Sequence, residues 1–183
     1  MGQSSEIFHD AVGADHQYTL RAQHDLAAEY LEAGRTEEAI ALFERVRDLQ
    51  VSKLGADHDD TLTTRNDLGV AYLYAGKTAE AIAIFGHVRD AGVQHLGADH
   101  PDTLYSLNNL AMAYLRAGQP PTQAVALLEQ VCDARTRQLG ADHPRTFATL
   151  CNLAEVYLGC RRCGEGDCCA GASERPPAAA ARS

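Results

Sequence analysis

Leu96-Gly97-Ala98-Asp99-His100-Pro101 is the most informative segment of the chain, because most of it recurs at regular intervals. The tetrad Gly-Ala-Asp-His begins at Gly13, Gly55, Gly97 and Gly140, so successive copies lie 42, 42 and 43 residues apart. The one extra residue falls at the doubled Pro120-Pro121. A fixed period of this length is the sequence signature of a repeat architecture, and it takes precedence over any single motif.

A second pattern recurs inside each copy, at nearly constant spacing. Its three sets are Leu26, Ala27, Tyr30, Gly34, Ala39, Phe43 and Val46; Leu68, Gly69, Tyr72, Gly76, Ala81, Phe85 and Val88; and Leu110, Ala111, Tyr114, Gly118, Ala124, Leu128 and Val131. Apolar residues at helical spacing predict a first helix over about 17–33 and a second helix that ends near Leu54-Gly55. Each repeat is therefore expected to hold a pair of helices.

This order of small and large apolar residues resembles the tetratricopeptide repeat, whose paired antiparallel helices interlock small residues with aromatic ones. The common period of that repeat is about 34 residues, whereas the period here is 42. The longer period and the Leu-Gly-x-Asp-His-Pro connector are similar to those of the kinesin-light-chain subclass. The resemblance covers Gly13 to Tyr157. It implies an all-α fold, a right-handed α-α superhelix whose first helices line the concave side.

The repeats predict an array with partial units at both ends. We expect a partial preceding helix over residues 1–12, a repeat array over 13–158 and a disordered Cys/Ala/Pro-rich tail over 159–183. The repeats of the array are 13–54, 55–96, 97–139 and a half repeat over 140–158. Because the half repeat lacks a second helix, Leu150, Leu153 and Tyr157 are expected to stay partly uncovered.

Single residues predict two details of the second helices. Thr36, Thr78 and Thr122 are expected to be their N-caps. Gly86 and Gly92 lie inside the second helix of the second repeat, where each costs on the order of 1 kcal/mol relative to Ala. That helix is therefore expected to exchange its amide hydrogens fastest among the interior helices.

Composition and charge narrow the classes of partner. The formal net charge is −9 and the isoelectric point is near 5.3, so the mean field of the chain repels nucleic-acid phosphates and anionic lipids. The N-terminal sequence has no basic region followed by an apolar one, which a secretory signal would show. We therefore expect a cytoplasmic protein that binds neither nucleic acid nor membranes.

Four Asp-His pairs and a cysteine cluster are the residues that could hold a metal. The pairs recur once per repeat, so helix layers about 8–10 Å thick separate them and they cannot share one ion. We interpret them as turn and cap residues. Cys160 and Cys163 form one C-x-x-C, but Cys168 and Cys169 are adjacent and seldom chelate one tetrahedral ion together. A zinc site in the tail stays open as an alternative, and the expectation is no metal and no cofactor.

The informative polar residues lie just before the motif leucine of each first helix. Asp25, Asp67, Asn109 and Asn152 stand directly before it, and His24, Asn66, Asn108 and Cys151 stand one residue earlier. On a concave surface, a ladder of asparagines can hydrogen-bond the main chain of an extended peptide. Equal weight goes to the alternative that they support the neighbouring turns. The candidate peptide-binding residues are His24, Asp25, Asn66, Asp67, Tyr74, Tyr105, Asn108, Asn109, Met112, Arg116 and Asn152.

The resemblance also says which ligand not to expect. Chaperone-binding members of the family grip a C-terminal carboxylate with Lys and Arg side chains on the first helices. The matching positions here hold His24, Asn66 and Asn108, so that activity is not carried over. Asp25 and Asp67 instead suggest a peptide with a Lys or Arg at one end.

The sequence thus predicts a protein–protein interaction scaffold that binds an extended peptide in the concave groove. The alternative is a structural or sensor fragment of a larger signalling protein, without a ligand of its own. Phosphate-loop, nucleophile-elbow and zinc-protease motifs are absent from the sequence, so no enzyme is expected. Self-association through the uncovered C-terminal edge is a further expectation.

Overall fold

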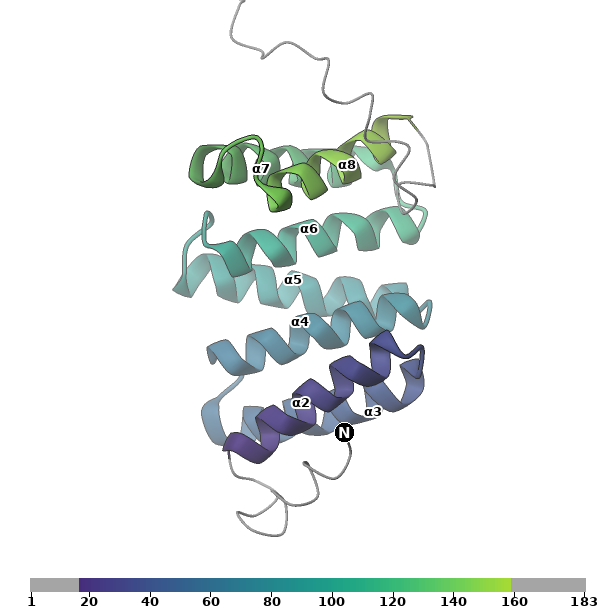
Figure 1. The fold of residues 1–183 in the computed structure, drawn as a ribbon, viewed down its shortest axis with the longest axis vertical. Helices are drawn as coiled ribbons and strands as arrows, with labels where there is room; N and C mark the ends of the chain where they lie inside the picture. The colour runs from purple at the N-terminus through teal and green to yellow at the C-terminus, as the bar shows by residue number, and fades with distance from the viewer. Residues whose placement is uncertain (1–16, 159–183) are drawn as a thin grey trace, which may run out of the picture.

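The structure, a computed structural model, describes residues 17–158, all of whose regular structure is helical (Figure 1). The helices are α2 (Gln17–Glu32), α3 (Thr36–Leu54), α4 (Asp59–Tyr74), α5 (Thr78–His95), α6 (Pro101–Arg116), α7 (Pro121–Leu139) and α8 (Pro144–Leu158). The predictions made for residues 1–12, for the Asp15-His16 pair and for the cysteine-rich tail lie outside the described residues.

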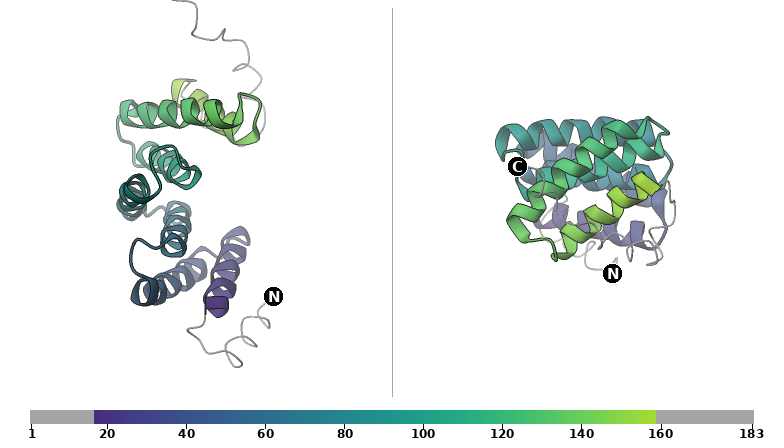
Figure 2. Two further views of the ribbon diagram at one scale, coloured as in Figure 1. Left: turned by 90° about the vertical axis from the view of Figure 1, so that its left-hand side faces the viewer. Right: turned by 90° about the horizontal axis from the view of Figure 1, so that it is seen from above.

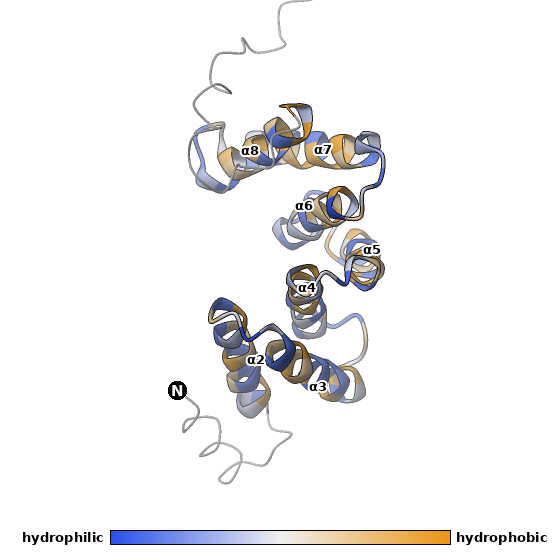
Figure 3. Cartoon of the chain, turned by 90° about the vertical axis from the view of Figure 1, so that its right-hand side faces the viewer, coloured by the Kyte–Doolittle hydropathy of each residue, from blue (hydrophilic) through white to orange (hydrophobic). Residues whose placement is uncertain are grey.

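The helices form a solenoid in which each helix packs against the next along the chain. The even-numbered helices also pack against one another, α2 on α4, α4 on α6 and α6 on α8. Figures 2 and 3 show that this row lies on the inner side of the curve, with α3, α5 and α7 behind it. The all-α architecture expected from the repeats is confirmed, and the first helix of each repeat faces the hollow side.

Glycines in the left-handed region make the turns between helices. Gly34, between α2 and α3, has φ 75°, and Gly55, after α3, has φ 99°. A side chain at such a position would be strained, which explains why both glycines recur in every described repeat. The equivalents are Gly76 and Gly118 in the first kind of turn and Gly97 and Gly140 in the second.

The Asp-His pairs begin the first helices, as predicted, and the histidine is the capping residue. Nδ1 of His58 accepts a hydrogen bond from the main-chain N–H of Asp60 at 3.2 Å. His100 and His143 accept the equivalent bonds at 3.3 and 3.1 Å. Each imidazole therefore satisfies one of the N–H groups that a helix start leaves free.

The predicted threonine caps of the second helices are wrong. Arg35, Lys77 and Pro120 occupy the N-cap positions, and none of them makes a side-chain cap bond. The reason is the tight glycine turn, after which α3 and α5 start one residue earlier than expected and α7 starts two residues earlier. The carbonyl of Arg35 already accepts from the N–H of Ala39 at 3.0 Å, so Thr36 is the first residue inside α3.

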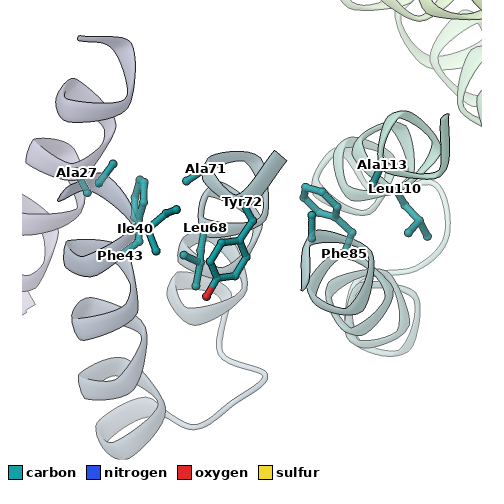
Figure 4. Packing of buried hydrophobic residues seen from close by; sticks show 11 residues of the cluster. Ala27, Ile40, Phe43, Leu68, Ala71, Tyr72, Phe85, Leu110 and Ala113 are labelled. Atoms are coloured by element: carbon teal, nitrogen blue, oxygen red, sulfur yellow. The ribbon is translucent and has the colours of Figure 1, made fainter. Parts of the chain in front are cut away.

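The core is a thin layer between the helices, as Figure 4 shows. Phe43 and Phe85, on the second helices, are fully buried and pack with Leu68 and Leu110 of the first helices. The layer ends at α8, where Leu150 and Leu153 are half-buried and Tyr157 is 54% exposed. The partial exposure predicted for these three side chains is confirmed.

Candidate functional site

The inner side of the solenoid holds a hollow of about 440 Å³ between α4 and α8, called the inner hollow below. Asn66, Asp67, Tyr105, Asn108 and Asn152, all on first helices, line it. Its floor includes Gly92 of α5, where a Cβ would lie 2.8 Å from Oγ1 of Thr103. The glycine predicted to soften α5 therefore has a packing reason, because it lets α6 approach closely.

Polar side chains join successive first helices across the hollow side. Nε2 of His24 lies 3.0 Å from Oδ2 of Asp67. Nδ2 of Asn109 donates to Oδ1 of Asn66 at 3.4 Å, and Nδ2 of Asn152 donates to Oδ1 of Asn108 at 3.1 Å. We call these three pairs the inter-helix ladder. Each pair links one motif position to the following motif position in the next repeat.

The ladder uses part of the hydrogen-bonding capacity of its amides. Each asparagine has two N–H donors and one carbonyl acceptor, and each ladder bond occupies one atom of each partner. Asn66 is only 5% exposed, whereas Asn108, Asn109 and Asn152 are half-buried. The ladder therefore orients these amides while leaving Nδ2 of Asn108 and Oδ1 of Asn152 without a partner in residues 17–158.

His24, in the N-terminal pair of the ladder, lies next to two carboxylates that shift its pKa. Burial by itself lowers the pKa of this imidazole, but the hydrogen bond and charge of Asp67, followed by those of Asp25, raise the pKa above 6.5 overall. His24 also packs edge-on against the Phe43 ring, at 5.3 Å between ring centroids. The two carboxylates thus favour the protonated imidazole at this end of the inner face.

A second hollow, of about 310 Å³, lies between α2, α3 and α4. His24, Asp25 and Gln50 line it, and Thr63 lines both hollows. Thr63 is therefore part of the wall of both hollows.

The remaining candidates from the sequence lie outside both hollows. Tyr74, at the end of α4, is 66% exposed, and the guanidinium of Arg116 lies 5.9 Å from its ring centroid. Arg116 also donates to the carbonyl of Leu73 at 3.3 Å. Asn109 contributes to the ladder, and Met112 is half-buried on α6; neither lines a hollow.

Sequence reasoning missed Arg135 and Arg145, both of which line the inner hollow. Arg135 lies on α7, a second helix, whereas the candidate residues were all taken from the first helices. A signal was available, because Arg135 stands four residues after the motif Val131. The equivalent residues are Gln50 and Gly92, and both line a hollow as well. One position on the second helix thus reaches the inner face in every described repeat.

Within residues 17–158, histidine, cysteine, aspartate and glutamate side chains do not gather into groups of three or more that could hold a metal ion. The helices of this part of the chain also fall short of the length and apolar character needed to cross a bilayer.

Paired antiparallel helices, glycine turns and a lined inner face define a helical repeat scaffold. Residues 2–50 and 30–92 match one family model described as tetratricopeptide repeat, and residues 103–145 match a second one. The chain belongs to the tetratricopeptide repeat family. Repeats of this family generally mediate protein–protein interactions, and the scaffold is typically not catalytic.

Solved structures are similar to the chain over most of its length. A crystal structure from Podosopora anserina, described as a kinesin light chain with nearly identical TPR-like repeats, is 32% identical with a TM-score of 0.71. A single-substitution variant of it gives 32% and 0.73, and in both cases the match covers 86% of this chain and 74% of the other.

The structure of BtubC (BKLC) from P. vanneervenii is similar in fold, with 19% identity and a TM-score of 0.69. That match covers 82% of this chain and 60% of the other. No curated protein matches the chain. The right-handed superhelix implied by the family resemblance and the similarity to kinesin-light-chain repeats are confirmed.

Proposed function

We propose that the chain is a protein–protein interaction scaffold that binds an extended peptide segment along its inner face. The observation that carries the proposal is the inner hollow. Its volume of about 440 Å³ lies within the range of ligand pockets, roughly 300–1,000 Å³. Candidate residues from three first helices line it together: Asn66, Asp67, Tyr105, Asn108 and Asn152.

The chemistry of the inner face suits a peptide main chain. Nδ2 of Asn108 can donate to a peptide carbonyl, and Oδ1 of Asn152 can accept from a peptide N–H. Because the ladder bond already fixes both side chains, little rotamer entropy is lost on binding. Tyr105 is 45% exposed at the hollow and offers a flat apolar surface to a peptide side chain.

Occlusion of the hollow tests the proposal without breaking the ladder. Peptides are selected from a random-sequence display library on the unmodified chain, and their affinities are measured by fluorescence anisotropy. Thr63→Arg places a long side chain at the point shared by both hollows and is expected to weaken binding at least about tenfold. Tyr105→Ala is expected to weaken binding as well.

Phe147→Ala is the matched control, because Phe147 is an aromatic residue of a first helix that is about as exposed as Tyr105, lies outside both hollows and is not a candidate binding residue. It is expected to leave the affinity unchanged. Equal affinities for the Thr63→Arg variant and the unmodified chain would place the binding surface elsewhere.

One observation favours a second candidate, a structural array without a ligand. The ladder amides bond to one another, as they would if their purpose were to hold the first helices together. Selection of no peptide at all from the library would support this candidate against the first.

A further inference from the structure

Arg135 is a buried cation whose charge is not matched by a nearby carboxylate. Its side chain is on α7, and the residue is 7% exposed. Nη1 donates to the main-chain carbonyl of Arg145 at 3.2 Å and to Oγ1 of Thr149 at 2.7 Å. Both acceptors are neutral. Within residues 17–158, Arg135 forms no ion pair, and Nε and Nη2 have no acceptor.

A second arginine stands beside it. Arg145, at the start of α8, is exposed and lines the inner hollow together with Arg135. Burial, and next to it the charge of Arg145, lower the pKa of the Arg135 guanidinium. A lowered pKa is the direction expected when a cation faces another cation and no anion compensates it.

Packing alone does not require a cation at this position. The equivalent residues of the two preceding repeats are Gln50 and Gly92, both neutral, and in those repeats too the second helix packs on the following first helix. A buried charge is costly unless an opposite charge and hydrogen bonds compensate it. The third repeat therefore carries a charge that its architecture does not need and that an anion in the hollow would compensate.

We propose that Arg135 and Arg145 bind the carboxylate of an aspartate or glutamate side chain in the peptide partner. This proposal rests on the proposed function and names the chemistry of its ligand. A guanidinium presents its N–H groups in a fork that matches a carboxylate. The free Nε and Nη2 of Arg135 and the exposed head of Arg145 supply such donors at one place in the hollow.

A side chain fits this site better than a peptide C-terminus does. Arg135 lies on α7, which Figure 3 places in the outer row, behind the first helices that would contact the peptide main chain, and the residue is only 7% exposed. A Glu or Asp side chain can reach inward from a peptide that continues along the inner face. A terminal carboxylate would have to bring its own main chain into that depth.

The other charges of the hollow give the bound peptide a direction. Asp59 and Asp67 of α4 and Asp102 of α6 line the same hollow as the two arginines of α7 and α8. An acidic side chain is therefore placed toward α8 and a basic one toward α4. The sequence suggested, from Asp67, a peptide with a Lys or Arg at one end. The structure-based proposal adds an acidic side chain at the other end of the peptide.

Peptide binding with charge-neutral replacements tests the proposal. Peptides selected from the random library are remade with each Asp or Glu changed to Asn or Gln, and anisotropy gives their affinities. Arg145→Gln is the main variant, because the bond from Arg135 goes to the main chain of residue 145 and survives the change. Arg137→Gln is its control, since Arg137 is 68% exposed, pairs with Asp99 and lies outside the hollow.

One acidic position in the peptides is expected to matter. Its amide replacement and Arg145→Gln should each weaken binding about tenfold, and together by little more than either alone. Arg137→Gln should leave the affinity within about twofold. Arg145→Glu should reverse the preference toward Lys at the same peptide position.

The contrary results are distinct from one another. Peptides that bind, lose affinity with Thr63→Arg and ignore every acid-to-amide change overturn this proposal and leave the proposed function standing. Peptides that lose affinity only when their C-terminus is amidated overturn it in favour of a terminal carboxylate. If no peptide binds the unmodified chain, the proposed function fails and this proposal fails with it.

Discussion

Gly69 of α4 lies directly against the ring of Phe85 on α5. A Cβ on Gly69 would stand 2.7 Å from Cε1 of that ring, closer than carbon atoms pack. The third repeat places Ala111 and Leu128 at the same two positions, and both are fully buried. The first repeat, in contrast, holds Ala27 together with Phe43, and both are fully buried, so the close fit of Gly69 against Phe85 is particular to the second repeat.

Gly69→Ala is therefore expected to destabilise the chain, although alanine is the better helix former. Overpacking costs about 1–3 kcal/mol and the gain in helix propensity is about 1 kcal/mol, so a net loss of up to about 2 kcal/mol should appear in urea denaturation. Adding Phe85→Leu recreates the pair of the third repeat and should recover part of the loss. A double variant less stable than both single variants would contradict this account.

Gly86 invites the opposite prediction. A Cβ at Gly86 meets nothing within 4 Å, so Gly86→Ala should stabilise α5 by about 1 kcal/mol. The equivalent residues are Glu44 and Glu129, which accept hydrogen bonds from Tyr72 and Tyr157 of the following first helix. Tyr114 is the matching tyrosine of the third repeat, and its helix α6 packs on α5, which carries Gly86.

Gly86→Glu should therefore stabilise the chain more than Gly86→Ala does. The added hydrogen bond from Tyr114 is worth about 0.5–1.5 kcal/mol, and Tyr114→Phe combined with Gly86→Glu should remove that increment. Equal stability of the alanine and glutamate variants would show that the hydroxyl does not reach. Hydrogen exchange of α5 measures the same change locally, because removing Gly86 should slow its amide exchange.

The bond between His24 and Asp67 should make stability depend on pH. The folded state raises the pKa of His24 above 6.5, so the bond contributes fully below pH 6.5 and its contribution is lost as the pH rises through the folded pKa. The test compares the unfolding free energy of the unmodified chain with that of His24→Gln at two pH values. The advantage of the unmodified chain should be larger at about pH 5.5 than at about pH 8.5, by on the order of 1 kcal/mol. If the stability difference between the two proteins instead grew toward high pH, the folded state would lower the pKa of His24, which would contradict this account.

The ladder pair Asn108 and Asn152 should show coupling in a double-mutant cycle. Each single change to Ala removes one hydrogen-bonding partner and should cost about 1 kcal/mol of the free energy of unfolding. The double variant should lose less than the sum, with a coupling of about 0.5–1.5 kcal/mol. Strictly additive losses would mean that the bond contributes nothing to stability.

Much of the fold could be predicted from local patterns. Helical periodicity and glycine positions predicted the first helices and their turns, because those features depend on neighbouring residues alone. The threonine caps failed because a positive-φ glycine starts the next helix one residue early, as at Arg35. Helix ends respond to such details of turn geometry, which residue preferences average away.

The candidate site was predicted less completely. The asparagines were placed on the correct helices, but the pairing of Asn66 with Asn109 depends on how far each repeat rotates against the next. Arg135 was missed because it lies on a second helix and bonds to Arg145 and Thr149 of the next first helix, and a helix-by-helix pattern does not describe such contacts between helices. The sequence offers residue types and spacing, whereas the hollow is a property of several helices packed together.

The bonds of the ladder have a sense along the chain. In both asparagine pairs the earlier repeat supplies the carbonyl oxygen and the later repeat supplies the N–H group. A repeat that carries asparagine at both positions therefore offers a carbonyl acceptor to the following repeat and an N–H donor to the preceding one. If such a repeat were duplicated within the chain, the two copies could form the same asparagine–asparagine hydrogen bond. The array can therefore lengthen by duplication without needing a different contact between repeats.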